Sequence, residues 1–516
     1  MMPKLQSFNE KRKKSKMRKS GILMAVSSLP SKYGIGSFSK EAYEWVDFLV
    51  KAGQKFWQIL PLGPTGYGDS PYQSFSTFAG NPYYIDLEAL IEQGLLSVED
   101  CDKEDLGPNA QYVDYEKIYY GKFRLLRKAY ENALTDKEHP LENNKEFVRF
   151  CKEEKSWLDD YALFMALKDE NDGKSFLEWE NALRTRKKTE LAKAKNRLKK
   201  ETDFYRFLQF HFMIQWLKLK EYANESGVEI IGDIPIYVAL DSSDTWAHPE
   251  LFQLDNNGLP TGVAGCPPDY FSKTGQLWGN PLYNWDYHKK TGFKWWMERL
   301  GNCFRLYDMV RIDHFRGFDA YYNIPYGDKT AEFGHWEDGP GYDLFKEMSE
   351  VLGDKPVIAE DLGLLTDSVI RLVERCGYPG MKILEFAFDS NEDNDYLPHN
   401  YQKNCVVYTG THDNDTVLGW YPTLKRKDRK FLRDYLGIKR TGNLNWELIR
   451  LGMSSVAETC IIPIQDVIGL GSEGRMNTPS TLGYNWQWRL LKGQCTEEMA
   501  QKLNRMVKVY GRDGRG

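Results

Sequence analysis

The sequence lacks the cysteine patterns that hold zinc or build a disulfide framework. Its 8 cysteines are scattered singly along 516 residues, and no two of them form a Cys-x-x-Cys pair. This usage fits a reducing compartment. The sequence also lacks any run of about 18 apolar residues, so no membrane-spanning helix is expected.

An excess of charge of one sign is missing too. The formal net charge is −5, from 69 basic and 74 acidic side chains, and this balance argues against a protein that binds nucleic acid. The basic run over residues 11–19 is not followed by a separate apolar segment and cleavage site. Residues 1–20 are therefore expected to be a solvated tail, with an address signal as the minor alternative. Together these absences predict a cytoplasmic protein.

Short apolar runs that end in polar or turn residues recur eight times along the chain. They cover residues 22–26, 56–60, 229–233, 309–313, 357–360, 383–386, 406–409 and 461–464. Segments of helical character separate several of them, such as 40–52, 342–352 and 366–376. This alternation predicts an α/β protein built on a (β/α)8 TIM barrel. An open doubly wound sheet is the alternative, but no glycine fingerprint opens an early helix.

Two gaps between these runs are too long for ordinary connections. Residues 63–227, between the second and third predicted strands, become rich in Lys, Glu, Leu and aromatics after residue 142, so we expect a largely helical insertion there. Within it, residues 183–198 look like an exposed helix face. Residues 238–295 are loop-like and carry several aromatic rings. Long loops at strand ends of a barrel usually build its binding site, although a plain surface loop is the alternative.

Acidic residues stand at or just beyond the ends of four predicted strands. They are Asp233, Asp313, Glu360 and Asp413. The carboxyl ends of barrel strands meet at one face, and that face holds the active site. Burying several carboxylates together is costly unless they have partners or a function. One such acid would more often be a structural cap, so the four matching positions favour a functional site.

Two carboxylates that flank one bond are the machinery of glycoside chemistry. Arg311 lies two residues before Asp313 on the same strand face, so its guanidinium should keep that carboxylate ionised as a nucleophile. A purely structural Arg311–Asp313 ion pair is the alternative. Glu360 has no neighbouring cation in the sequence and is the better proton donor, although Asp361 is an equally available carboxyl.

The last acid has a neighbour of its own. Asp413 directly follows His412, and the two could hold sugar hydroxyls and help to distort the ring. The alternative for His412 is a histidine packed in the core, which is the usual place of a lone histidine.

The motifs Arg311-Ile-Asp-His-Phe-Arg-Gly317, Ala359-Glu-Asp-Leu-Gly363 and Gly410-Thr-His-Asp-Asn414 resemble those of the amylomaltase family of 4-α-glucanotransferases, relatives of the α-amylases. Further matches lie at 27–30, 34–36, 62–72, 81–83, 232–237, 267–271, 278–281, 464–466 and 475–477. The resemblance runs from about residue 20 to about residue 490. Motifs this long and in this order are highly specific.

The resemblance implies a fold and a reaction. The fold is a single catalytic barrel over residues 21–510, with insertions at about 63–227 and 238–295 and no separate C-terminal β-domain. The reaction moves an α-1,4-glucan segment from a donor maltooligosaccharide to the 4-hydroxyl of an acceptor glucose or glucan. It is a retaining double displacement through a covalent glycosyl-enzyme. Donors would include starch- or glycogen-derived glucans.

The resemblance also assigns roles by position. Asp313 falls on the nucleophile, Glu360 on the general acid/base and Asp413 on the transition-state stabiliser. Supporting positions fall on Arg311, His412 and Asp233. Sugar-contacting positions fall on Ser70, Tyr72, Tyr270, Phe271, Trp278, Asn280 and Asn477. Tyr270 and Phe271 are candidates for a lid that keeps water out while the acceptor is held.

One departure and two alternatives qualify this assignment. The residues after Asp233 are Ile-Pro-Ile-Tyr-Val and lack the histidine common in the wider amylase pattern, which favours amylomaltase. A hydrolase using the same acids with water is the first alternative. A catalytically dead glucan-binding protein is the second, and the three intact acids argue against it. The chemistry needs neither a metal nor a cofactor, and no nucleic-acid or membrane partner is expected.

Overall fold

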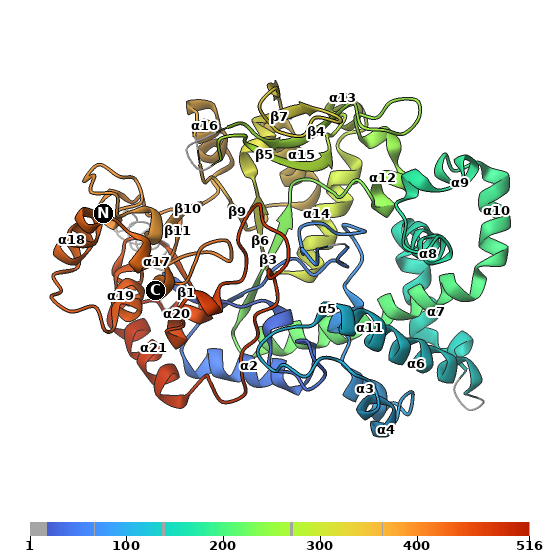
Figure 1. Cartoon of the computed structure of the whole chain (residues 1–516), viewed down its shortest axis with the longest axis horizontal. Helices are drawn as coiled ribbons and strands as arrows, with labels where there is room; N and C mark the ends of the chain where they lie inside the picture. Colours follow the sequence, from blue (N-terminus) through green and yellow to red (C-terminus); the bar gives the residue numbers. More distant parts are fainter. Residues whose placement is uncertain (1–17, 67, 137–139, 269–271, 364, 515–516) are drawn as a thin grey trace, which may run out of the picture.

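The computed structural model describes residues 18–66, 68–136, 140–268, 272–363 and 365–514. Within these ranges, eight parallel strands form a nearly closed barrel at the centre of the molecule (Figure 1). They are β1 (Lys19–Leu23), β2 (Phe56–Gln58), β3 (Glu229–Pro235), β6 (Met309–Asp313), β9 (Val357–Ala359), β10 (Gly380–Ile383), β11 (Cys405–Tyr408) and β12 (Thr459–Pro463). Their hydrogen-bonded order is β10-β11-β12-β1-β2-β3-β6-β9. The backbone N–H of Ala359 donates to the carbonyl of Pro379 at 3.0 Å, which links the two end strands. The predicted (β/α)8 barrel is confirmed.

The first and sixth strands lie earlier in the chain than predicted. The sixth strand is Gly380–Ile383, and residues 384–386 form a 3-10 turn. Gly380 and Lys382 weaken the apolar signal of the true strand, whereas the apolar Leu384 of the turn is fully buried and resembles a strand residue. The first strand begins at Lys19, where the ammonium pairs with Glu229 at 2.8 Å. The predicted tail over residues 1–20 therefore extends two residues too far, and residues 1–17 lie outside the described part of the chain.

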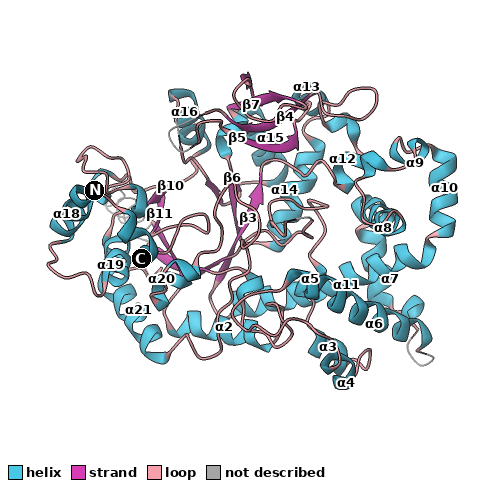
Figure 2. Ribbon diagram, in the orientation of Figure 1, coloured by secondary structure: helices cyan, strands magenta, loops and turns pink. Residues whose placement is uncertain are grey.

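Helices surround the barrel (Figure 2). They include α2 (Lys40–Lys51), α14 (Lys294–Leu306), α15 (Tyr342–Leu352), α16 (Asp367–Cys376), α18 (Arg426–Leu436), α19 (Leu444–Ser454) and α21 (Glu497–Tyr510). The helices predicted over 40–52, 342–352 and 366–376 are confirmed. They form because apolar residues recur at helical spacing: α15 buries Leu344, Phe345 and Met348 towards the strands.

The long gap between β2 and β3 is largely helical after residue 86. Its helices are α3 (Leu87–Glu92), α4 (Val98–Asp102), α5 (Tyr115–Lys117), α6 (Phe123–Thr135), α7 (Lys145–Glu153), α8 (Lys155–Glu170), α9 (Asn181–Arg184), α10 (Lys188–Arg197) and α11 (Lys199–Glu225). The helix expected over 183–198 is interrupted, because residues 185–187 separate α9 from α10. Arg186 adopts a left-handed φ of 54° there. Its guanidinium lies 4.2 Å from the centre of the Trp246 ring.

The region expected to be a loop, 238–295, contains two strands of a second sheet. The antiparallel order is β5-β4-β7-β8, with β4 (Gly262–Cys266), β5 (Gln276–Pro281), β7 (Ala320–Pro325) and β8 (His335–Asp338). The region also holds α12 (Ser243–Ala247) and α13 (Trp285–Lys290). The sequence of β4 was predicted to be a loop because it contains Gly262 and Gly265. A Cβ on Gly262 would lie 1.9 Å from the Asn323 side chain, and one on Gly265 would lie 2.1 Å from the Gln276 carbonyl oxygen.

Among the described residues, no helix combines the length and the apolar character needed to cross a membrane.

Candidate active site

Arg311 lies between two carboxylates at the carboxyl end of the barrel. Its Nη1 is 2.8 Å and 2.7 Å from the two carboxylate oxygens of Asp233, at the end of β3. Its Nη2 is 3.0 Å from Oδ1 of Asp313, as the shared strand face predicts. Asp233 is fully buried, whereas 29% of the Asp313 side chain is exposed. The sequence pointed to the Asp313 contact but not to the closer pairing with Asp233, which comes from the neighbouring strand.

Asp313 has a pKa of about 6, above the usual range for an aspartic acid. Burial raises this pKa most, and the charges of Asp233 and Asp413 raise it further. Arg311 opposes them. The expected effect of Arg311 is therefore present but smaller than the effect of burial. At pH 7 Asp313 is still mostly ionised.

Glu360 stands directly after β9 and faces the same site. The backbone N–H of His314 donates to its Oε2 at 2.7 Å, and the backbone N–H of Leu362 donates to its Oε1 at 3.0 Å. His314 adopts a left-handed φ of 51°, a sparsely populated conformation that directs its N–H at the carboxyl. Burial and the charge of Asp313 raise the pKa of Glu360 to about 8, although Arg311 and the two N–H groups oppose this. At pH 7 Glu360 is mostly protonated.

Asp361 does not compete with Glu360 as the proton donor. Its Oδ1 accepts the backbone N–H of Met381 at 2.7 Å, on the adjacent β10. A Cβ on Gly380 would lie 2.2 Å from its Oδ2, so only glycine leaves room for this carboxyl. Successive side chains point in opposite directions along extended chain, so one acid faces the site and the other faces β10. This placement favours Glu360 over Asp361 as the predicted proton donor.

Asp413 and His412 lie in the loop of residues 409–416, called here the β11–α17 loop because it joins β11 to α17 (Val417–Trp420). Two side chains hold Asp413. Asn477 Nδ2 donates to its Oδ1 at 2.6 Å, and Arg475 Nη2 donates to its carbonyl oxygen at 2.7 Å. His412 Nε2 is 3.4 Å from its Oδ2. Because 42% of the Asp413 side chain is exposed, its carboxylate is open to a ligand.

Tyr72 connects the two halves of the site. Its hydroxyl donates to Asp233 Oδ2 at 2.8 Å and lies 2.9 Å from His412 Nε2. A phenol has one hydrogen to donate, so Nε2 of His412 must carry the hydrogen in that second contact. The two rings are stacked at 5.2 Å with an interplanar angle of 18°. His412 is therefore buried behind Asp413 and oriented by Tyr72.

The other predicted sugar-contacting residues have different surroundings. Trp278 is half-buried, and its ring meets the His314 ring edge-on at 4.8 Å. Asn280 is buried, where its Nδ2 donates to the carbonyl of Val238 at 2.7 Å. Ser70 Oγ accepts the backbone N–H of Tyr72 at 3.3 Å. Tyr270 and Phe271 lie outside the described residues.

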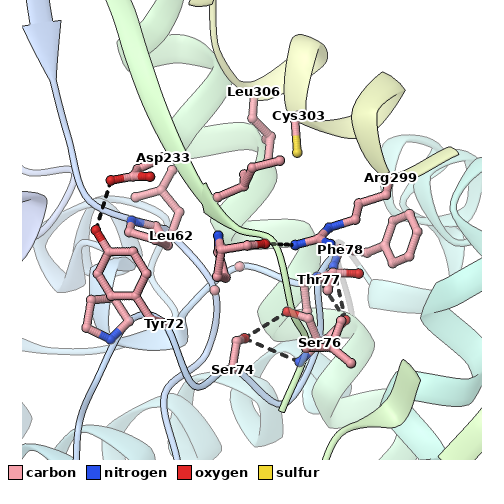
Figure 3. A pocket seen from close by; sticks show the side chains of 18 of the residues that line it. Leu62, Tyr72, Ser74, Ser76, Thr77, Phe78, Asp233, Arg299, Cys303 and Leu306 are labelled. Atoms are coloured by element: carbon pink, nitrogen blue, oxygen red, sulfur yellow. Dashed lines mark hydrogen bonds between the residues drawn. The ribbon is translucent and has the colours of Figure 1, made fainter. Parts of the chain in front are cut away.

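A small cavity lies behind Asp233 and Tyr72, with a volume of about 50 Å³ (Figure 3). Leu62, Cys303 and Leu306 contribute to its wall. A cavity needs roughly 10–15 Å³ to hold one water, so this one has room for a few waters and not for a sugar ring. Neither Asp313 nor Asp413 lines this cavity.

Two contributors were not among the residues predicted from sequence. Arg475 holds the backbone of Asp413, and the backbone N–H of His314 holds Glu360. Arg475 belongs to a matched motif, so it could have been found. The role of His314 depends on its left-handed backbone conformation, which cannot be predicted from the residue type. Within the described ranges, no group of three or more His, Cys, Asp or Glu side chains could hold a metal ion.

Comparisons with known proteins agree with this geometry. The family pattern described as 4-alpha-glucanotransferase matches residues 24–494. The 4-alpha-glucanotransferase of Clostridium butyricum is 50% identical over 491 residues, which cover 95% of this chain and all of that protein. That of Thermus thermophilus is 48% identical over 499 residues, covering 95% of this chain and 98% of that protein.

A solved structure is similar over nearly the whole length. The amylomaltase from Streptococcus agalactiae in complex with acarbose superposes with a TM-score of 0.93 at 42% identity, covering 96% of this chain and 99% of the other. The resemblance drawn from the sequence motifs is therefore confirmed. With its barrel, its three acids at the strand ends and these relatives, the chain belongs to the 4-α-glucanotransferase family.

Proposed function

We propose that the protein transfers segments of α-1,4-glucan from a donor maltooligosaccharide to the 4-hydroxyl of an acceptor glucose or glucan. One observation carries the assignment of roles. Asp313 and Glu360 face one site with pKa values of about 6 and about 8, so an ionised and a protonated carboxyl coexist near pH 7. A retaining displacement begins from this pair.

The first half-reaction forms a covalent intermediate. A carboxylate oxygen of Asp313 attacks the anomeric carbon while Glu360 gives its proton to the glycosidic oxygen, and the reducing-end fragment leaves. The charge of Asp313 disappears as the ester forms. Because that charge helps to raise the pKa of Glu360, its loss lowers the same pKa and prepares Glu360 to act as a base.

The second half-reaction releases the transferred segment. Glu360 takes the proton of the acceptor's 4-hydroxyl, and the resulting oxygen attacks the anomeric carbon. The ester bond to Asp313 then breaks and its carboxylate returns. Asp413, held by Asn477 and Arg475, is positioned to accept hydrogen bonds from sugar hydroxyls and to favour the positive charge that develops on the ring.

Contacts within and between the two insertions support our proposal that residues 21–510 form a single catalytic unit. The backbone N–H and the hydroxyl of Thr77, in the first insertion, each donate to the buried Asp244 of the second at 2.9 Å. Gln209 of α11 exchanges two hydrogen bonds with the backbone of Gly80. We propose that these contacts hold the insertions as fixed walls around the strand ends, where an α-glucan would lie.

The test is incubation with maltotriose alone, with the products resolved by chain length over time. Transfer predicts glucose together with a ladder of longer maltooligosaccharides. Asp313→Asn should abolish the ladder, because an amide is not a nucleophile here, whereas the exposed control Asp434→Asn should leave it intact. Glucose and maltose without longer chains would show that water is the acceptor and that the protein is a hydrolase. No product from maltotriose or longer glucans would support a binding protein.

A further inference from the structure

Glu385 is a buried acid directly beneath the β11–α17 loop. It follows β10 in the 3-10 turn Leu384–Phe386, and only 6% of it is exposed. Its backbone N–H donates to the carbonyl of Thr409 at 3.2 Å. A Cβ built on Gly410 would lie 3.1 Å from Oε1 of Glu385, so the carboxyl packs against the loop backbone at this point.

The nearest acid on the other side, Asp466 of α20 (Ile464–Ile468), ties both ends of the same loop. Its carboxylate accepts the hydroxyl of Thr409 and, at 2.8 Å, the backbone N–H of Val417. Burial raises the pKa of Asp466 to about 6, so it is mostly ionised at pH 7. Glu385 therefore lies next to a carboxylate that is mostly ionised and already accepts two hydrogen bonds from the loop.

The charged groups that face Glu385 give it no free cation. Asp466 and Asp415 add negative charge, and Arg475 is the opposing positive charge. The guanidinium of Arg475 is already committed to the carbonyl of Asp413 at 2.7 Å. Oε1 of Glu385 is buried without a hydrogen-bond partner among the described residues. Burial, reinforced by the two acids, raises the pKa of Glu385 well above its usual range.

A neutral carboxyl can occupy this place, but a carboxylate would be desolvated, repelled by two acids and left without a partner. We infer that Glu385 is a positioning residue. In its uncharged form it packs the β11–α17 loop against the end of β10, and its ionisation displaces that loop together with His412 and Asp413. This role rests on the proposed function, in which Asp413 acts on the sugar.

The decisive variant is Glu385→Gln, which keeps the shape of the side chain and cannot ionise. We would measure kcat/KM for maltotriose disproportionation from pH 6 to pH 10 in the variant and the wild type. The titration of Glu360 is common to both proteins and cancels in the variant-to-wild-type ratio at each pH. Normalised to pH 6, this ratio should rise on the order of threefold or more once the wild type acquires the buried charge, which the variant cannot acquire.

A second measurement follows the thermal unfolding midpoint over the same pH range, with the exposed Glu92→Gln as the matched control. The midpoint of Glu385→Gln should exceed that of the wild type by a margin that grows with pH, while the control stays parallel to the wild type. A constant margin would overturn the inference, because Glu385 would already be ionised in the folded protein.

The two measurements distinguish the protonation state of Glu385 from its effect on the position of Asp413. An activity ratio that stays flat even above the pH at which the stability margin levels off would show that Glu385 ionises in the folded protein without displacing Asp413, which also overturns the inference. A wild type that forms no longer maltooligosaccharides at any pH would refute the proposed function, and the positioning role would fall with it. Growth of both the margin and the ratio supports the inference.

Discussion

At the scale of single residues, the site places two carboxyl groups in different protonation states by their surroundings. Asp313 pairs with Arg311 at 3.0 Å, whereas Glu360 accepts two backbone N–H groups, is close to the charge of Asp313 and feels Arg311 only as an opposing charge that does not pair with it. Their pKa values are therefore raised by different amounts. The general lesson is that the identity of the acid and of the nucleophile follows from the partners, since both are ordinary carboxylic acids.

The two pKa values predict a bell-shaped pH profile of kcat/KM. Activity needs ionised Asp313, so it should rise as the pH increases through about 6. It also needs protonated Glu360, so it should fall as the pH increases through about 8. Initial rates with maltotriose between pH 4 and pH 10 would check both limbs. Full activity persisting at pH 10 would contradict the assignment of Glu360 as the acid in the rate-limiting step.

Asn477 should affect the chemical step more than binding. Its amide donates to Asp413 at 2.6 Å, and a hydrogen bond to a charged group contributes about 1.5–3 kcal/mol. Asn477→Ala should therefore lower kcat by roughly 10- to 100-fold with a smaller change in KM. The reason is that Asp413 is proposed to stabilise the charge on the sugar ring mainly in the transition state. The exposed Asn257→Ala is the control. An increase in KM at unchanged kcat would instead assign Asn477 to ground-state binding.

At the scale of elements, the strands made of buried apolar residues could be predicted from the sequence. Strand segments that need glycine because neighbouring atoms leave no room for a side chain could not. All eight barrel strands are detectable because β-branched and apolar residues are buried on both faces of a parallel sheet. Strand β4 escapes detection because Gly262 and Gly265 are required by neighbouring atoms. The start of β10 was misplaced for the same reason, because this strand begins at Gly380. The four acids at strand ends were visible in sequence, but the Arg311–Asp233 pairing joins residues 78 positions apart.

Gly380 offers a test of this steric argument. A Cβ there would lie 2.2 Å from the Asp361 carboxylate, which is itself fixed by the N–H of Met381. Gly380→Ala should lower the free energy of unfolding by roughly 1–3 kcal/mol, as forced overpacking does. Gly442 is the matched control, since a Cβ there meets nothing within 4 Å. Equal unfolding midpoints for Gly380→Ala and Gly442→Ala would show that Asp361 moves aside freely.

At the scale of the whole molecule, the raised pKa of Glu360 lowers the stability of the fold at neutral pH. Glu360 has a folded pKa of about 8, well above its value in an unfolded chain. Between these two pKa values the unfolded chain has lost the proton while the folded protein retains it, so stability decreases as the pH rises. Below the unfolded pKa this penalty is absent. Burial elsewhere in the barrel must therefore offset a buried carboxyl that opposes folding at neutral pH.

Replacing Glu360 with glutamine should accordingly stabilise the protein while inactivating it. Glu360→Gln removes the proton donor, so transfer should fall on the order of 100- to 10,000-fold. The same change should raise the free energy of unfolding by up to a few kcal/mol at pH 8, with the gain shrinking towards pH 4. Denaturant unfolding at pH 4, 6 and 8 measures this gain, with Glu92→Gln as the exposed control. A gain independent of pH would mean that packing of the amide, and not relief of a buried charge, stabilises the variant.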